Sequence, residues 1–300
     1  MSVCQGEIEV KQNTTLIISV IQSMDDNFKL KFKNVRKLST QEYKEKSKYP
    51  FDLLELLVDT SINDHLQSLT EGTTVNELGL KKPSLWKAYT SRHHKGLLLV
   101  KGCFTVDGET YWASQCLYSY SLSPSKTNIG TLDMVDYQRL RWATIGYHHD
   151  WDTKVYRDDN RSHFPPDLKR LIEKLAEILG FYNFVAEAGI INYYHMNSTL
   201  SGHTYHSELN KDAPLFSISF GQSALFLLGG LTKEEDPSII KLESGDFLIM
   251  SRESRLCYHG VPRILKSEKQ TWLSCDSHGR TLSYLNNNRM NVNVRQVNFY

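Results

Sequence analysis

The sequence predicts an α+β fold, in which a helical N-terminal half supports a β-rich C-terminal half of sandwich or barrel type. Three observations predict it. A chain of 300 residues has room for one large domain or two modest ones with a full hydrophobic core. Residues 166–180 repeat apolar side chains at helical spacing. From residue 186 onward, short β-like runs alternate with turn-forming residues.

The first 85 residues are predicted to form a mainly helical N-terminal extension, followed by a second domain over residues 86–300. Within the extension, Phe51–Leu57 packs apolar residues densely, which favours a helix. We expect the extension and the second domain to pack as one continuous unit.

One strand and one helix are predicted next along the chain. Leu97–Val100 is a short apolar run between two glycines, which is typical of a buried strand. The clearest helix is predicted from Pro166 to Gly180, where apolar residues recur at steps of three and four. Proline favours the first turn of a helix, and glycine favours its end.

The C-terminal half contains a series of short β-like runs. Turn-forming residues such as Gly229-Gly230 and Ser244-Gly245-Asp246 separate them. Many short strands divided by such turns indicate a sandwich or barrel of jelly-roll type. The predicted strands are Gly189–Tyr194, Leu215–Phe220, Ala224–Leu228, Phe247–Ser251 and Arg289–Val297.

Composition excludes several classes of protein. The 35 basic and 34 acidic residues nearly cancel, so a polybasic coat for nucleic acid is absent, although a local basic patch stays possible. No run of 18 apolar residues occurs, so neither a transmembrane helix nor a membrane partner is expected. Five scattered cysteines without a CxxC pair predict neither a disulfide framework nor a cysteine zinc site, and they favour a reducing compartment.

The predicted strand Arg289–Arg295 has one polar face, because side chains alternate between the two faces of a strand. Two interpretations follow. The face either meets water, as in an ordinary half-exposed strand, or forms the wall of a cavity, with arginines available to a planar carboxylate. The polar face carries Arg289, Asn291, Asn293 and Arg295, and the other face carries Met290, Val292 and Val294.

Two further pairs of residues share a strand face at i, i+2 spacing. They are Asn192 with Tyr194 and His203 with Tyr205, and a second histidine, His259, follows much later. Two histidines in adjacent strands of a small barrel can converge on one metal, although a single histidine is more often structural. A redox iron needs two imidazoles and open positions, and an acidic co-substrate needs a fixed guanidinium. The chain contains both kinds of residue.

These motifs resemble the AlkB family of iron(II)/2-oxoglutarate-dependent dioxygenases, over roughly residues 77–297. The resemblance implies a double-stranded β-helix, the jelly-roll core of the family, with supporting helices and a nucleotide-recognition lid. The segments that carry it are residues 140–148, 186–194, 217–230, 244–246, 254–256, 259–263 and 289–295.

The resemblance also implies the cofactors and their ligands. Fe(II) and 2-oxoglutarate are the cofactors of the family. In the family, the residues at the positions of His203 and His259 bind iron. Those at the positions of Asn192, Tyr194 and Arg289 hold 2-oxoglutarate, and the one at the position of Arg295 lies beside the metal and the substrate base.

The activity that the resemblance implies is oxidative demethylation of nucleobases, namely N6-methyladenine in DNA and N1-methyladenine in tRNA, with loss of formaldehyde. The base must be unpaired or flipped to reach the iron, so single-stranded, bulged or looped DNA and tRNA are the expected partners. We expect residence in the nucleus, with the mitochondrion or cytoplasm as alternatives, and a monomer as the default state.

The sequence departs from the family at one iron ligand. The family's motif is His-x-Asp…His, and Tyr205 stands at the position of the aspartate. A tyrosine phenol is neutral near pH 7, so it is a poor replacement for a carboxylate. Glu208 lies nearby in sequence, but its odd spacing from His203 predicts that it faces away if the strand continues.

Three explanations of Tyr205 stay open: a natural loss of activity, an altered metal site, or a substitution particular to this sequence. Two functions follow from them. One is an iron and 2-oxoglutarate demethylase, and the other is a nucleic-acid-binding protein that keeps the pocket but lacks turnover.

Overall fold

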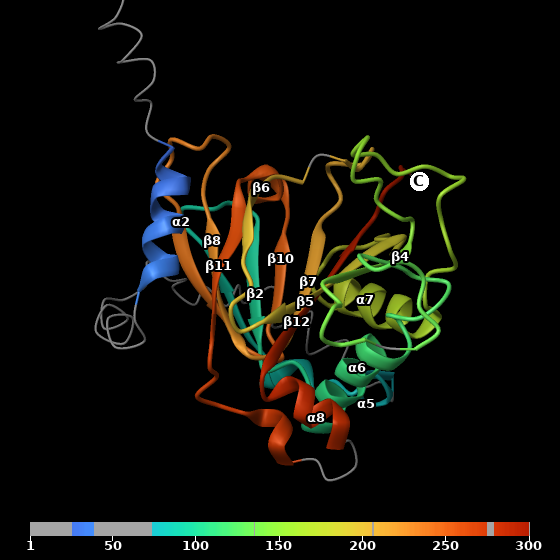
Figure 1. The fold of residues 1–300 in the computed structure, drawn as a ribbon. Coiled ribbons are helices and arrows are strands. Elements are labelled where there is room, and N and C mark those ends of the chain that lie inside the picture. The colour runs from blue at the N-terminus through green and yellow to red at the C-terminus, as the bar shows by residue number, and fades with distance from the viewer. Residues whose placement is uncertain (1–25, 39–73, 135, 206, 275–278, 300) are drawn as a thin grey trace, which may run out of the picture.

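The computed structural model describes residues 26–38, 74–134, 136–205, 207–274 and 279–299. Two β-sheets dominate it, and helices flank them (Figure 1). The predicted helix at Phe51–Leu57 lies outside the described residues. None of the described helices is long and apolar enough to cross a membrane.

The larger sheet has eight strands, and each neighbouring pair with a described register is antiparallel. Its central strands join segments that are far apart in sequence, as the jelly-roll prediction requires. The order is β1 (Lys87–Thr90), β2 (Leu97–Lys101), β10 (Phe247–Met250), β7 (Leu215–Gly221), β12 (Asn288–Arg295), β5 (Ala188–His195), β4 (Trp142–Gly146) and β3 (Lys126–Thr127).

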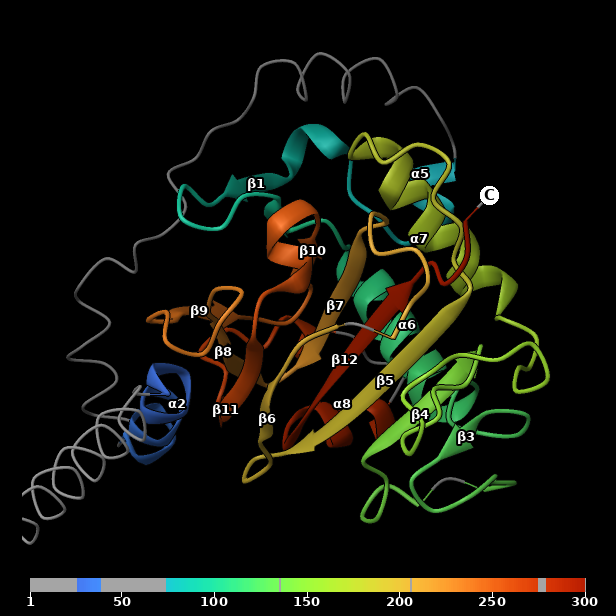
Figure 2. The ribbon, with the colours of Figure 1, turned by 90° about the horizontal axis from the view of Figure 1, so that it is seen from above.

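The smaller sheet has four antiparallel strands and packs against one face of the larger sheet (Figure 2). A shift of register interrupts the pairing of β11 with both of its neighbours. The order is β6 (Leu200–His203), β11 (His259–Leu265), β8 (Ser223–Leu228) and β9 (Ser238–Leu242).

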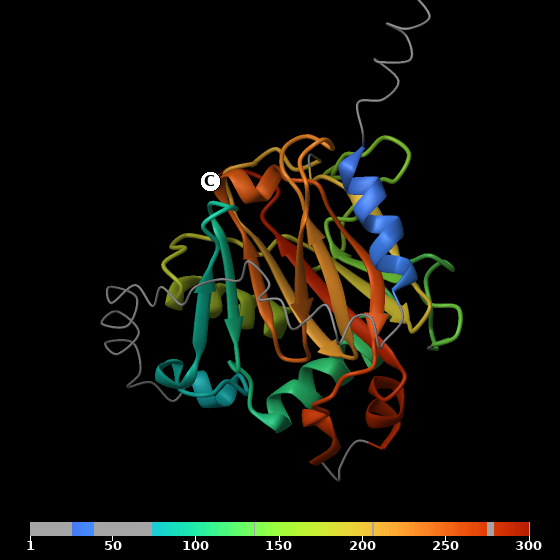
Figure 3. The same ribbon diagram turned by 90° about the vertical axis from the view of Figure 1, so that its left-hand side faces the viewer.

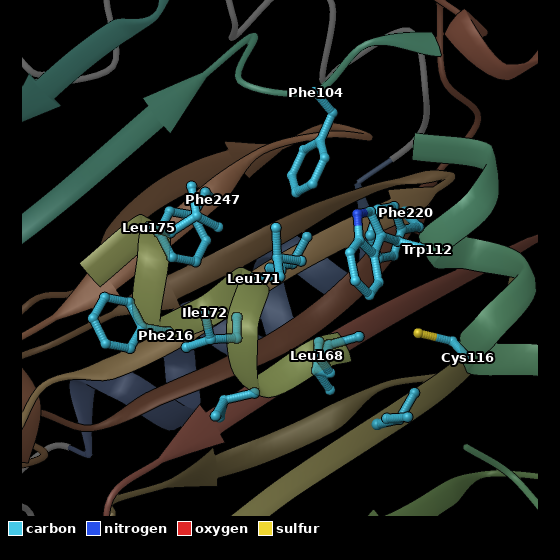
Figure 4. Packing of buried hydrophobic residues seen from close by; sticks show 14 of the residues in the cluster. Phe104, Trp112, Cys116, Leu168, Leu171, Ile172, Leu175, Phe216, Phe220 and Phe247 are labelled. Atoms are coloured by element: carbon cyan, nitrogen blue, oxygen red, sulfur yellow. The ribbon is translucent and has the colours of Figure 1, made fainter. Parts of the chain in front are cut away.

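Two helices cover the other face of the larger sheet (Figure 2). They are α6 (Val106–Tyr118) and α7 (Pro166–Ile178). The apolar face of α7 contains Leu168, Leu171 and Leu175, and it packs on a core that includes Phe216 of β7 (Figure 4). The predicted helix from Pro166 is therefore confirmed, and it ends near Gly180, whose φ of +81° suits glycine.

Shorter helices complete the described fold. They are α5 (Thr74–Glu77), η1 (Pro83–Leu85), η2 (Arg252–Leu256), η3 (Thr271–Ser274) and α8 (Gly279–Leu285). The η2 turn begins at a capping box, in which the Ser251 and Ser254 side chains each accept from the other residue's backbone.

Every strand that the sequence predicts is present. Leu97–Val100 corresponds to β2, and the five C-terminal runs correspond to β5, β7, β8, β10 and β12. The largest difference lies at the end of β12, which the structure closes at Arg295 rather than Val297. Such boundary differences are expected, since strand ends depend on hydrogen bonds to neighbouring strands.

The described part of the N-terminal extension packs against the sheets. Helix α2 (Asn27–Lys37) lies along the outside of the smaller sheet (Figures 1 and 3) and buries Phe28 against Leu225 and Leu227. Gly202 and Gly229 make room for this ring, because a Cβ on either would lie 3.0 Å or less from it. The described residues of α2 thus pack on the smaller sheet.

Candidate functional site

A pocket lies between the facing surfaces of the two sheets. The larger sheet contributes Tyr194 from β5 and Arg289 and Asn291 from β12, and the smaller sheet contributes Phe226 and His259. Polar and charged groups thus lie inside a β-sandwich, where burial costs free energy unless a partner compensates for it. A pocket with a few convergent polar groups is the expected place for a ligand.

The polar face of β12 lines this interior. Its side chains are buried, so the interpretation in which they meet water is wrong. The reason is that β12 lies between β5 and β7 in the centre of the larger sheet, and the helices and the smaller sheet cover its two faces. The alternation itself is confirmed, with Arg289, Asn291, Asn293 and Arg295 on the buried polar face.

Arg289 is a buried cation with spare hydrogen-bonding capacity. Its Nη2 donates to Ser219 Oγ at 2.7 Å and its Nη1 donates to the Gln222 carbonyl at 3.1 Å. Its Nε is buried and finds no acceptor among the described residues. Burial lowers the pKa of Arg289 to about 10, so the side chain still carries its charge at neutral pH. An anion in the pocket would complete its hydrogen bonds.

Tyr194 and Asn192 lie on the strand next to Arg289. Tyr194 pairs in register with Arg289 and lines the pocket, while Asn192 pairs with Asn291 and is half-buried. Burial raises the pKa of Tyr194 above its usual value, so its phenol stays a hydrogen-bond donor. The described pocket lining includes Tyr194 but not Asn192, which lies one step along the same face.

His203 and His259 come together across the smaller sheet. They pair directly between β6 and β11, and their ring centroids are 4.3 Å apart. Each Nδ1 lies 3.0 Å from a backbone carbonyl oxygen, that of Ser201 for His203 and that of Cys257 for His259. When Nδ1 donates to a carbonyl, the lone pair lies on Nε2, which is the tautomer that binds metals.

The environment of His259 fits a metal ligand. Its Nε2 is buried and meets no hydrogen-bond partner in the described part of the chain. Burial and the neighbouring His203 lower the pKa of His259 well below its usual value. The imidazole is therefore neutral at pH 7, as metal binding requires.

Tyr205 lies against the histidine pair but not on the strand. Because β6 ends at His203, the predicted i, i+2 strand pair is wrong. The Tyr205 ring centroid nevertheless lies 4.2 Å from that of His259. Burial raises the pKa of Tyr205 despite the nearby guanidiniums of Arg295 and Arg255, so the phenol is neutral at pH 7. It supplies no negative charge to the site.

Glu208 turns inward. The prediction that it faces away assumed that the strand continues, and the strand ends five residues earlier. Its Oε1 lies 3.1 Å from Arg295 Nη1 and its Oε2 lies 3.0 Å from Arg255 Nη2. Burial would raise the pKa of Glu208, but the two guanidiniums more than offset it and the pKa lies below its usual value. Within the described ranges, no three His, Cys, Asp or Glu side chains form a metal cluster, so Glu208 does not complete the histidine pair.

An aromatic cluster lies beside Arg295. Arg295 Nη1 donates to Tyr156 Oη at 2.8 Å, and Tyr156 belongs to the segment between β4 and α7. The Tyr156 ring contacts His149, which in turn contacts Trp151. Trp151 also contacts Trp142 at the start of β4 and is 50% exposed. The cluster thus runs from the buried guanidinium to the surface.

Sequence reasoning missed this cluster and the roles of Glu208 and Arg255. The aromatic residues lie in a loop that has no periodicity to reveal which side chains meet. Arg255 stands in one of the segments that resemble the AlkB family, but nothing in its spacing predicts an ion pair with Glu208.

The donor set fits Fe(II) in part. Two imidazoles that lie side by side, with the buried Nε2 of His259 unpartnered among the described residues, match the histidine ligands of a non-haem iron site. The unpartnered guanidinium nitrogen of Arg289 matches an acidic co-substrate such as 2-oxoglutarate. The carboxylate ligand is the part that the described residues lack.

Comparisons with known proteins agree with this geometry. Residues 96–295 match the 2OG-Fe(II) oxygenase superfamily. The nucleic acid dioxygenase ALKBH1 of Homo sapiens is 36% identical, and the match covers 73% of this chain and 68% of the human protein. The tRNA demethylase abh1 of Schizosaccharomyces pombe is 32% identical over 253 residues, which cover 84% of this chain and 76% of the yeast protein.

The match to the mouse ALKBH1 protein is 39% identical and spans 58% of that protein's length. Among solved structures, that of OsALKBH1 aligns with a TM-score of 0.52 at 22% identity and covers 70% of this chain and 99% of that one. This similarity confirms the predicted jelly-roll fold.

Proposed function

Because the chain belongs to the AlkB family of the 2OG-Fe(II) oxygenase superfamily, we propose that it demethylates N-methylated nucleobases in DNA or tRNA. It is a dioxygenase whose cofactors are Fe(II) and 2-oxoglutarate. The observation that carries the proposal is the pair of His203 and His259, of which His259 lines the same pocket as the buried cation of Arg289.

In this proposal, His203 and His259 hold the metal through their Nε2 atoms. The backbone carbonyls that accept from their Nδ1 atoms orient both rings. When bound, Fe(II) and 2-oxoglutarate would activate O2, so that the N-methyl group is hydroxylated and lost as formaldehyde while 2-oxoglutarate is oxidised to succinate and CO2.

Arg289 binds the distal carboxylate of 2-oxoglutarate. Its guanidinium is planar and already oriented by Ser219 and the Gln222 carbonyl, so little conformational entropy is lost on binding. Tyr194 is in register with Arg289 and donates a further hydrogen bond from its neutral phenol. Asn192 lies two residues along the same strand, and in this proposal it contributes another hydrogen bond to the co-substrate.

The substrate base lies beside Arg295, next to the aromatic cluster. Tyr156, His149 and Trp151 offer flat surfaces on which an extruded base and its neighbours stack. The relatives differ in substrate: one is named a tRNA demethylase and another, the ALKBH1A protein of Arabidopsis thaliana, a DNA N(6)-methyladenine demethylase. We propose N6-methyladenine and N1-methyladenine as the bases to test first.

The rival function is a nucleic-acid-binding protein without turnover. Tyr205 is the observation that favours it, since the neutral phenol does not replace a carboxylate ligand. The named relatives are enzymes, so the comparisons lend it no support.

The test is formaldehyde release from methyladenine oligonucleotides in the presence of Fe(II), O2 and 2-oxoglutarate. The chain, its Tyr205→Asp variant and a His259→Ala control are compared on DNA and RNA strands. We expect release that depends on 2-oxoglutarate and that His259→Ala abolishes. Failure of both the chain and Tyr205→Asp on every oligonucleotide would refute the demethylase proposal.

A further inference from the structure

Glu208, Arg255 and Arg295 form a buried ion-pair triad next to the histidine pair. Their exposed fractions are 2%, 1% and 4%, and Glu208 bridges the two guanidiniums through separate carboxylate oxygens. Within the described residues, the ion pairs of both arginines are with Glu208. The triad therefore carries two positive charges and one negative charge.

Both guanidiniums lie over the ring of Tyr205. The Cζ atoms of Arg295 and Arg255 are 4.9 and 5.3 Å from its centroid, and the ring itself lies against His259. A tyrosine side chain carries no formal charge near pH 7, so it does not reduce this positive charge. The Tyr205 ring thus contacts both guanidiniums of the triad and both histidines.

The arginines have further unsatisfied donors. Arg255 Nη1 and Arg295 Nε are buried and have no acceptor in the part of the chain that the structure describes. A buried guanidinium with an incomplete set of acceptors keeps a strong field in its surroundings. The carboxylate of Glu208 is the described group that weakens this field.

The backbone fixes Glu208 independently of its ion pairs. Two residues along, Asn210 donates its backbone N–H to the Val297 carbonyl at 3.0 Å. The Asn210 side chain accepts from the backbone N–H groups of Asp212 and Ala213. The chain next to Glu208 therefore has contacts that do not depend on either of its ion pairs.

We propose that Glu208 is a positioning residue that offsets the charge of Arg255 and Arg295, so that the histidine pair can hold a divalent cation. Glu208 also holds Arg295 in line with Tyr156 of the aromatic cluster. The proposal rests on the proposed function, since it assumes that His203 and His259 are the metal ligands.

The sign of the effect separates an electrostatic role from a structural one. Glu208→Gln keeps the shape of the side chain and removes the negative charge, so it should lower the affinity for a divalent cation. Arg255→Gln breaks the same ion pair but removes a positive charge, so it should raise that affinity. If the ion pair served only to hold the fold together, both variants would weaken binding.

The experiment measures Mn²⁺ binding to the whole apo chain by calorimetry. Residues that hydrogen-bond to metal ligands commonly change metal affinity by about 10–100-fold. Glu208 contacts the two arginines rather than a histidine, so we expect Glu208→Gln to weaken Mn²⁺ binding by about tenfold, the lower end of that range. Arg255→Gln should strengthen it, and the double variant should return close to the unsubstituted chain. Glu253→Gln is the matched control, because Glu253 is exposed and pairs only loosely with Lys95 at 3.6 Å.

Equal Mn²⁺ affinity in the unsubstituted chain and Glu208→Gln would overturn the proposal, and so would weaker binding in Arg255→Gln. If Glu208→Gln does not fold, the direction in which Arg255→Gln changes Mn²⁺ affinity still distinguishes an electrostatic role from a structural one. If the unsubstituted chain binds too weakly to measure, the same set is compared in the Tyr205→Asp background. Mn²⁺ binding that is unaffected by His259→Ala would instead count against the proposed function.

Discussion

Replacing Tyr205 by aspartate should rebuild the metal site. The change removes a neutral ring that lies 4.2 Å from the His259 ring and introduces a carboxylate at the position of the family's third ligand. The unpartnered buried donors of Arg255 and Arg295 are available to the carboxylate oxygens that do not face the metal. We therefore expect Tyr205→Asp to bind Fe(II) more tightly and to demethylate faster.

The size of this effect is bounded by the attraction between a carboxylate and a divalent metal. Even two unit charges about 4 Å apart interact by about 4 kcal/mol at an effective dielectric constant of about 20, and a divalent ion has twice that charge. Desolvating the carboxylate removes part of this gain. A net increase of about 10–100-fold in metal affinity remains, which corresponds to about 1.4–2.8 kcal/mol.

Two assays compare the chain with Tyr205→Asp. Calorimetry with Mn²⁺ measures metal affinity, and formaldehyde and succinate are measured with a methyladenine oligonucleotide. Tyr205→Phe is the matched control, because it keeps the ring and removes only the hydroxyl. We expect it to behave like the unsubstituted chain, since a neutral phenol is a poor ligand.

Two results would refute this reasoning. Full activity in the unsubstituted chain, unchanged by Tyr205→Asp, would mean that another residue ligates the metal. A large loss of metal affinity in Tyr205→Phe would mean that the phenol oxygen is itself a ligand.

Three further predictions concern Arg289, nucleic-acid binding and the buried His148. Arg289→Lys should weaken 2-oxoglutarate binding almost as much as Arg289→Ala, by about tenfold or more, because an ammonium does not reproduce the planar contact; unchanged affinity in calorimetry with Mn²⁺ would remove this assignment. The chain should bind bubble or single-stranded probes more tightly than a duplex, and Trp151→Ala should cost about 1–3 kcal/mol with the former; equal binding to duplex and bubble probes of one sequence would contradict this. Burial lowers the pKa of His148 to about 4, below its value in the unfolded chain. The folded state therefore favours the neutral ring. The stability that this provides is present above about pH 6.5 and is lost as the pH falls toward 4. The free energy of unfolding in urea should fall less between pH 7.5 and pH 5 in His148→Gln than in the unsubstituted chain. An equal fall in both proteins would exclude His148 as the cause.

Local patterns were enough to predict the elements of the fold. The strands β2, β5, β7, β8, β10 and β12 and the helix α7 follow from alternation, helical spacing and turn residues, which act within a few residues along the chain. The same alternation placed Arg289 and Arg295 on one face of β12. The sequence also determined which residue types the site contains, including the tyrosine in place of a carboxylate.

The tertiary structure alone decided the surroundings of those residues. Whether the polar face of β12 meets water depends on what covers the sheet, and the packing of the smaller sheet buried it. Glu208 pairs with Arg255 and Arg295 across 47 and 87 residues, after a strand that stops at His203. Local sequence periodicity does not predict contacts over such distances. The side chains of a loop are positioned by contacts with segments that only folding brings near.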